Sequence, residues 1–290
     1  MQRGVFYVFS SFLLWGLFPL YFHALRHINP VEILGHRIVW CLVCLGLVLA
    51  VRHQYRWIGT VLKTPRTLLV FAGTSLLICA NWGVYVYAIT SGQTLEASLG
   101  YFINPLVSVV IGALILKERL RLAQKAAFGV AAMGVAWIAL TTGATPWLGL
   151  CLAVTFAFYG LLRKIAPLGS LEGLSLETAM MMPLALVYLG YLWSTNDLGF
   201  ANANDTTRWL LLAAGPITAV PLLLFNAGVR LIPLSTTGII QYLSPTMVFL
   251  IGLFCFDEPF SSDRFIGFVF IWFAVGLFAV ESFLHARRAR

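Results

Sequence analysis

The sequence has few charged residues, and that scarcity decides its class. Only 10% of the 290 residues are charged, whereas 60% are hydrophobic, and the mean hydropathy is +0.89. A chain of this size cannot bury so much apolar surface inside a water-soluble globule, so lipid must be its solvent. The net charge of +8 does not indicate nucleic acid, because the basic residues fall in short clusters between apolar runs. We expect a polytopic membrane protein whose partner is the lipid bilayer, and no nucleic-acid partner.

Cysteine and aspartate are also scarce where chemistry would need them. The five cysteines all lie inside apolar runs, so they provide neither an extracellular disulfide framework nor a metal-ligand spacing. They are Cys41, Cys44, Cys79, Cys151 and Cys255. No aspartate lies in an apolar run, and the motifs Gly-x-Ser-x-Gly, Gly-x-Gly-Asp and His-Glu-x-x-His are absent. We therefore expect no intramembrane enzyme, no cofactor and no metal site.

What the sequence does have is apolar runs of membrane-spanning length. Crossing roughly 30 Å of hydrocarbon takes about 20 helical residues. Ten runs meet that length: residues 4–25, 31–51, 68–90, 95–116, 123–141, 146–163, 173–193, 208–229, 235–255 and 265–285. Most connections are short, and the longest, residues 194–207, is polar and rich in turn-forming residues. The expected fold is an all-α integral membrane protein with ten transmembrane helices.

The basic residues predict the orientation of these spans. With ten spans both termini lie on one side, and fifteen of the 19 Lys and Arg residues fall on that side. Cytoplasmic loops carry an excess of Lys and Arg, so we expect both termini in the cytoplasm. We expect a multi-pass protein located in the plasma (inner) membrane.

A repeat with a shift of 140 residues divides the chain. The residues Pro105, Ile111, Gly112 and Glu118 recur as Pro245, Ile251, Gly252 and Glu258. A weaker match at a shift of 144 pairs Trp15-Gly16 with Tyr159-Gly160. An odd number of spans between the copies would turn one upside down, which gives two inverted five-helix repeats, residues 1–141 and 142–290. Inverted repeats are typical of carriers that bind their solute near the bilayer midplane.

The two repeated prolines, Pro105 and Pro245, lie near the bilayer centre by helix rise. Proline has no N–H and clashes with the carbonyl four residues back, so the freed acceptors belong to Tyr101 and Gln241. A free carbonyl is tolerated in a membrane where it lines a watery cavity. The alternative is a packed kink that a neighbouring Ser or Thr satisfies. Polar neighbours of both prolines favour the cavity, so we interpret them as helix breaks with a gating role.

Aromatic and amide side chains at similar depth give a candidate binding site. The candidate substrate-binding residues are Trp15, Arg37, Asn81, Trp82, Tyr101, Asn104, Tyr159, Gln241 and Tyr242. A cavity with at most one cation suits a small amphipathic solute better than a phosphorylated one. Two of these residues have an alternative role: Arg37 as the partner of Glu32 or Glu96, and Asn81 as a hydrogen bond between helices.

Four ionisable residues in or near the spans are candidates for ion coupling. They are Glu32, His36, Glu96 and Glu177. Glu32 and Glu177 also have possible structural roles. Glu32 follows Asn29-Pro30 and could cap the start of its own helix. Glu177 could face a cytoplasmic vestibule or pair with Arg163 or Lys164.

Several stretches resemble one family. They are residues 32–37 (Glu-Ile-Leu-Gly-His-Arg), Asn81-Trp82, residues 95–106 (Leu-Glu-Ala-Ser-Leu-Gly-Tyr-Phe-Ile-Asn-Pro-Leu), residues 158–160 (Phe-Tyr-Gly) and Gln241-Tyr242 with Pro245. Together they resemble the RarD branch of the EamA group, in the drug/metabolite transporter superfamily, over essentially the whole chain. The resemblance implies a ten-helix carrier of two inverted repeats, with a central cavity and alternating access. It carries over no binding residues, and the chloramphenicol sensitivity to which the name refers does not establish a transported solute.

The sequence thus predicts a secondary transporter, working as an exporter, for a small amphipathic metabolite such as an amino acid or a drug-like compound. The alternatives are a membrane channel and a non-transporting regulatory membrane protein. We expect a monomer or a weak homodimer.

Overall fold

The computed structural model describes residues 2–91, 94–142, 147–256 and 262–288, and every regular element in these ranges is a helix. The elements are α1 (Gln2–Gly16), α2 (Phe18–Ala24), α3 (Pro30–Val51), α4 (Arg56–Leu62), α5 (Pro65–Thr90), α6 (Thr94–Leu114), α7 (Leu122–Thr142), α8 (Trp147–Ile165), α9 (Ser170–Ser194), α10 (Gly199–Asn202), α11 (Asp205–Val229), α12 (Leu234–Gln241), α13 (Leu243–Cys255) and α14 (Ser262–Arg288). Glu258 of the repeat lies outside the described residues.

The ten predicted spans correspond to these helices. Nine helices in the described part are long and apolar enough to cross a membrane, and Leu99–Leu114 within α6 forms a tenth, shorter apolar helix. Each predicted boundary falls within three residues of a helix end. The prediction of an all-α membrane protein with ten spans is therefore confirmed.

Two spans are interrupted rather than continuous. The first span breaks at Leu17, between α1 and α2, and the ninth breaks at Tyr242, between α12 and α13. Proline follows each break, as Pro19 in the first turn of α2 and Pro245 early in α13. Since the first N–H groups of a helix have no intrahelical acceptor, proline is tolerated there. Pro105, by contrast, lies inside α6, which continues through it.

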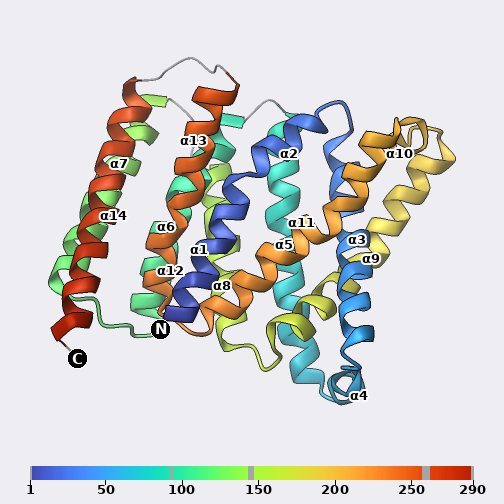
Figure 1. The fold of residues 1–290 in the computed structure, drawn as a ribbon, viewed down its shortest axis with the longest axis horizontal. Helices are drawn as coiled ribbons and strands as arrows, with labels where there is room; N and C mark the ends of the chain where they lie inside the picture. Colours follow the sequence, from blue (N-terminus) through green and yellow to red (C-terminus); the bar gives the residue numbers. More distant parts are fainter. Residues whose placement is uncertain (1, 92–93, 143–146, 257–261, 289–290) are drawn as a thin grey trace.

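The helices pack into a bundle with both chain ends at the same end (Figure 1). At one edge α7 and α14 run side by side, and they cross closely at two glycines. A Cβ atom on Gly134 would lie 2.7 Å from the carbonyl oxygen of Gly267. Small residues let helix backbones approach in this way within a membrane. At the opposite edge α3 packs against α9 and α11, and α6 contacts both α8 and α12 in between.

The end of the bundle that holds the chain termini is called here the termini half, and the other end the far half. Two long helices that begin in the far half have asparagine side-chain caps. Asn29 caps α3 by accepting a hydrogen bond from the Val31 N–H at 2.9 Å. Asn204 caps α11 in the same way through the Thr207 N–H at 2.8 Å. Short connections and defined caps leave the spans little freedom in their order around the cavity.

Candidate functional site

A cavity of about 310 Å³ lies between the two interrupted spans and α3, α5, α6 and α8. The first, third and ninth spans run away from the termini and contribute residues from their middle and later turns, while α3, α6 and α8 run back and contribute residues from their first half. Leu222 of α11 completes the lining. The cavity therefore occupies the far half and the middle of the bundle. Its volume is at the small end of the range for ligand pockets.

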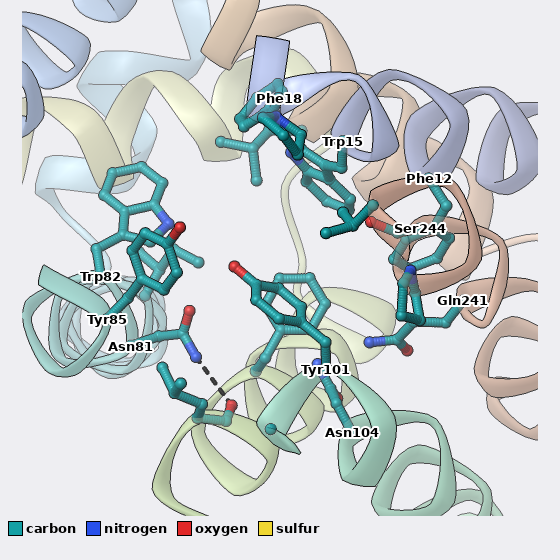
Figure 2. A pocket seen from close by; sticks show the side chains of 18 of the residues that line it. Phe12, Trp15, Phe18, Asn81, Trp82, Tyr85, Tyr101, Asn104, Gln241 and Ser244 are labelled. Atoms are coloured by element: carbon teal, nitrogen blue, oxygen red, sulfur yellow. Dashed lines mark hydrogen bonds between the residues drawn. The ribbon is translucent and has the colours of Figure 1, made fainter. Parts of the chain in front are cut away.

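Seven of the nine predicted substrate-binding residues line this cavity. They are Trp15, Arg37, Asn81, Trp82, Tyr101, Asn104 and Gln241. Figure 2 shows the side chains of Asn81, Trp82 and Tyr85 on one wall and those of Gln241 and Ser244 on the opposite one. Tyr101 is 44% exposed, and its hydroxyl points into the space between these walls (Figure 2).

Arg37 supplies the cation of the cavity. Its Nε–H donates to the Thr218 hydroxyl on α11 at 3.1 Å. The guanidinium carbon lies 4.7 Å from the ring centre of Trp82 and 5.7 Å from those of Phe18 and Phe22. Aromatic faces attract a cation electrostatically, more strongly when water is excluded. Among the described side chains no carboxylate lies within 4.0 Å of Arg37, so these rings and one hydroxyl hold it in place of an acid.

The expected pairing of Arg37 with Glu32 is not formed. The Glu32 carboxylate instead accepts hydrogen bonds from the backbone N–H groups of Gly199 and Phe200, at 2.9 and 2.8 Å. It therefore caps α10 rather than its own helix, whose cap is Asn29. The other possible partner, Glu96, lies outside the residues whose side chains the structure describes.

Asn81 has a fixed orientation. Its amide nitrogen donates to the carbonyl oxygen of Leu152 at 2.8 Å and to the Thr155 hydroxyl at 3.0 Å. A carbonyl oxygen can only accept, so the amide nitrogen must face α8. The Asn81 carbonyl oxygen is thereby turned toward the cavity (Figure 2). Both roles predicted for Asn81, a hydrogen bond between helices and a cavity wall, are present in the structure.

Two further amides bring unpaired acceptors to the same site. Asn104 and Gln241 are buried, and neither Asn104 Oδ1 nor Gln241 Oε1 has a hydrogen-bond partner among the described residues. Buried polar groups are normally paired, and an unpaired one costs free energy. Both oxygens are enclosed by protein, so the amide oxygen that is turned toward the cavity is that of Asn81.

Tyr159 and Tyr242 do not line the cavity. Tyr242 is 1% exposed and packs among Leu99, Phe102 and Phe268, at the break between α12 and α13. Tyr159 is fully buried below the cavity, with its ring 6.3 Å from that of Phe225. The structure therefore departs from the expectation that both tyrosines face the same space as Tyr101.

The two prolines occupy different settings. Pro245 lines the cavity, as expected of a break near the binding site. The carbonyl of Pro105 faces α12, where a Cβ atom on Gly238 would lie 2.6 Å from it. Only glycine fits at that crossing without displacing a neighbour. The fourth and ninth spans thus meet backbone to backbone where Pro105 faces Gly238.

In the termini half, Glu118 forms what we call the Glu118 latch, with Leu234 and Ser235. Its carboxylate accepts from the N–H groups of Leu234 and Ser235 at 2.6 and 2.9 Å, and from the Ser235 hydroxyl at 2.7 Å. Lys164 donates to the carbonyl oxygens of Val229 and Ile232 in the adjoining turn. These contacts close the termini half between α6, α8 and α12.

A second closure consists of the Glu177 cluster: Glu177, Arg163, Tyr159 and Asn226. Glu177 and Arg163 are completely buried, and the Arg163 Nε lies 3.6 Å from a Glu177 oxygen. The Tyr159 hydroxyl lies 3.2 Å from Glu177 Oε2 and 3.0 Å from the Asn226 amide nitrogen. The predicted pair with Arg163 therefore exists, whereas no open vestibule reaches Glu177.

His36, the remaining ion-coupling candidate, has structural contacts. Its Nδ1 accepts from the Trp40 indole N–H at 3.1 Å, and its ring lies 5.1 Å from that of Phe200. Its Nε2 is 3.7 Å from Glu32 Oε1. His36 and Glu32, both buried, thus join α3 to α10 in the far half.

Sequence reasoning missed part of the cavity wall and the latch. The missed lining residues include the aromatic side chains of Phe12, Phe18, Phe22, Tyr85 and Phe156. Aromatics near an interrupted helix were the available signal, but Phe and Tyr also face lipid in this composition. For the latch, the repeat pointed to Glu118 without indicating its partner.

The fold and the cavity define a multi-pass α-helical membrane protein with a solute-sized site between its central helices. The chain belongs to the EamA-like transporter family, whose model matches it twice, over residues 2–140 and 144–280. It is therefore a membrane transporter, and its relatives place it among the RarD-type members of that family.

Two relatives show this membership, and a solved structure shows the fold. The chain is 45% identical over 282 residues to the uncharacterized transporter YojE of Bacillus subtilis (strain 168), covering 96% of this chain and 93% of that one. It is 35% identical over 287 residues to Protein RarD of Escherichia coli (strain K12), covering 99% and 97%. A solved crystal structure with 16% sequence identity has the same fold, with a TM-score of 0.70 over 95% of this chain and 96% of that one.

Proposed function

We propose that the protein is a secondary transporter that carries a small amphipathic solute, such as an amino acid or a drug-like compound, by alternating access through the central cavity. The observation that carries this proposal is the contrast between the two halves. The far half holds a polar and aromatic cavity, while the Glu118 latch and the Glu177 cluster close the termini half. This arrangement suits one end state of a carrier, with its site accessible from the far side.

The chemistry of the cavity supports the solute class. Aromatic rings provide apolar walls, three amides provide polar contacts, and Arg37 is the cation of the lining. A phosphorylated solute would call for several Lys or Arg residues, because phosphate is recognised by clustered cationic donors. A small solute with an apolar body and a few polar groups fits better.

The inverted repeat is the proposed basis of the movement. The family model matches the chain twice in succession, and contacts between helices of one repeat have counterparts in the other. The third span packs on the sixth as the eighth packs on the first, and the fourth span meets the ninth directly. If the two repeats exchanged their conformations, the cavity would become accessible from the opposite side of the membrane.

The proposed orientation has the termini and the latch in the cytoplasm, in the inner membrane. The far side would then be the outside, and export would require the closed termini half to open toward the cell. Cysteines at Asn204 and His53, in a background without the native five, should react from opposite sides of the membrane. Reaction of both from the same side would remove the inverted-repeat basis of the proposal.

The alternative function is that of a membrane channel. A channel needs a continuous path, whereas two sets of buried contacts interrupt the termini half. Saturable uptake and stimulation by solute on the opposite side would favour the carrier, since a channel conducts without saturation. A regulator without transport would show neither.

The proposal is tested with the purified protein in lipid vesicles. Amino acids and neutral drug-like compounds are first screened for thermal stabilisation, and hits are then tested for counterflow. The same hit should protect cysteines placed at Tyr101 and at Gln241, because both side chains line the cavity. A cysteine at Asn204, exposed outside the cavity, is the matched control and should stay unprotected. Binding without protection at either cavity position would move the site elsewhere.

A further inference from the structure

The two charged residues Arg37 and Glu177 occupy equivalent positions in the two sequence repeats. Arg37 is the eighth residue of α3, and Glu177 is the eighth residue of α9. Their separation of 140 residues is the one that relates Pro105 to Pro245. Helices α3 and α9 also pack against each other, with opposite directions across the membrane. One position therefore carries a cation in the far half and an anion in the termini half.

The neighbours of these two residues correspond as well. Arg37 donates to Thr218 of α11, and Thr74 of α5 is buried near the Glu177 carboxylate, with its hydroxyl donating to the Phe71 carbonyl oxygen. Thr74 and Thr218 are separated by 144 residues, as are Trp82, which stacks on Arg37, and Asn226, which belongs to the Glu177 cluster. The same separation relates Trp15 in the cavity wall to Tyr159 in the cluster. The far half and the termini half of the bundle thus each contain one polar cage, and the two cages are built from equivalent positions of the repeats.

The two cages differ in what fills them. In the far half the cage is open, and Arg37 lines the cavity. In the termini half the cage is collapsed, and the side chain of Arg163 occupies the place beside Glu177. The fit is imperfect, since Glu177 Oε1 and the Arg163 Nε and Nη1 atoms have no hydrogen-bond partner among the described residues. A cation other than Arg163, with closer donors, could satisfy this carboxylate better.

We propose that the Glu177 cluster is a second solute-binding subsite, collapsed in this state, which binds a cationic group of the solute when the termini half opens. This inference rests on the proposed alternating access and names one more property of the solute. Arg37 meets an anionic group when the far half is open, and Glu177 meets a cationic group, such as an ammonium, when the termini half is open. Tyr159 and Asn226 would then line the route as Trp15 and Trp82 do now.

The test uses charged thiol reagents, because the solute is unidentified. The reporter is Asn226→Cys in a cysteine-free full-length chain, in vesicles with the termini side accessible. The cationic reagent MTSET and the anionic reagent MTSES are then applied to that side. We expect MTSET to react faster than MTSES, and Glu177→Gln to reduce this preference about tenfold, since the carboxylate concentrates cations once the opening of the termini half separates it from Arg163. If the single variant folds poorly, Arg163→Gln is compared with the double variant Arg163→Gln/Glu177→Gln, so that Glu177 is again the only charge that differs.

A second reporter, Tyr101→Cys, is treated in parallel and separates the possible failures. If the Tyr101→Cys thiol reacts from the termini side but the Asn226→Cys thiol does not, alternation occurs and the inference about Glu177 is overturned. It is also overturned if the Asn226→Cys thiol reacts with a preference that Glu177→Gln leaves unchanged. If the Tyr101→Cys thiol never reacts from the termini side, the proposed alternating access itself fails, and this inference fails with it.

Discussion

The Glu118 latch gives a quantitative prediction about the balance between the two states. The Glu118 carboxylate is half-buried and accepts three hydrogen bonds from Leu234 and Ser235. Opening the termini half must break them, because they join the end of the fourth span to the start of the ninth. The latch should therefore stabilise the state with the far half open at the expense of the other state.

The magnitude follows from the charge of the acceptor. A hydrogen bond to a charged group contributes about 1.5–3 kcal/mol net. Glu118→Gln keeps one acceptor oxygen but loses the charge, so we take the equivalent of one such bond, about 1.5 kcal/mol, as the loss after partial solvent screening. Since about 1.4 kcal/mol is a factor of ten in an equilibrium, the population open to the termini side should rise about tenfold.

The assay is the reaction rate of a cysteine at Tyr101 with a thiol reagent applied from the termini side. This rate follows the minor population, so it should increase about tenfold in Glu118→Gln, while the rate from the far side changes little. Gly112→Ala is a second test, because its Cβ would lie 2.7 Å from Glu118 Oε2 and displace the carboxylate. Glu172→Gln, the same change on α9 in the termini half, is the control. An unchanged or slower rate in both latch variants would refute the reasoning.

Three further predictions concern the cavity and the helices around it. Arg37→Ala should weaken solute binding about tenfold or more with little change in melting temperature, because no acid among the described residues would lose its partner; a large loss of stability with normal binding would contradict this. Arg37→Lys should also be impaired, since lysine lacks the planar group that stacks on Trp82. Gly238→Ala should destabilise the protein by about 1–3 kcal/mol, seen as a lower melting temperature, because its Cβ would meet Pro105 and Val109; Gly83→Ala, with nothing within 4 Å, should not. Alanine at Pro105 or Pro245 should restore an N–H, straighten the helix and lower the rate of transport more than the affinity, and normal rates in both variants would make the prolines packing features.

The sequence predicted the position of a residue along its helix better than the side of the helix to which its side chain points. Runs of about 20 apolar residues define a span with little ambiguity, and the proline positions led to Tyr101 and Gln241, which both line the cavity. Direction is harder to predict, because lipid-facing and core-facing positions are both apolar and periodicity fades. Tyr159 and Tyr242 were assigned by depth alone and face other helices.

The partners of the charged residues could not be read from the sequence either. Glu32 caps a short helix that begins 167 residues later, and Glu118 binds a turn 116 residues away. Such contacts depend on which spans are neighbours, which apolar runs do not specify. The pairing of Glu177 with Arg163 was among the expected alternatives because both ends of a short connection meet in any helical hairpin.

The unequal filling of the two cages has a consequence for the empty carrier. Closing the far half without solute would bury Arg37 with aromatic rings and one hydroxyl but no acid from the described residues, and a buried cation without a partner is costly. Closing the termini half carries no such penalty, because Arg163 already provides the countercharge of Glu177. The empty protein should therefore rest with its far half open, which is the end state that our proposal assigns to this structure. A solute with an anionic group would remove the penalty at Arg37, so solute binding itself would permit the far half to close.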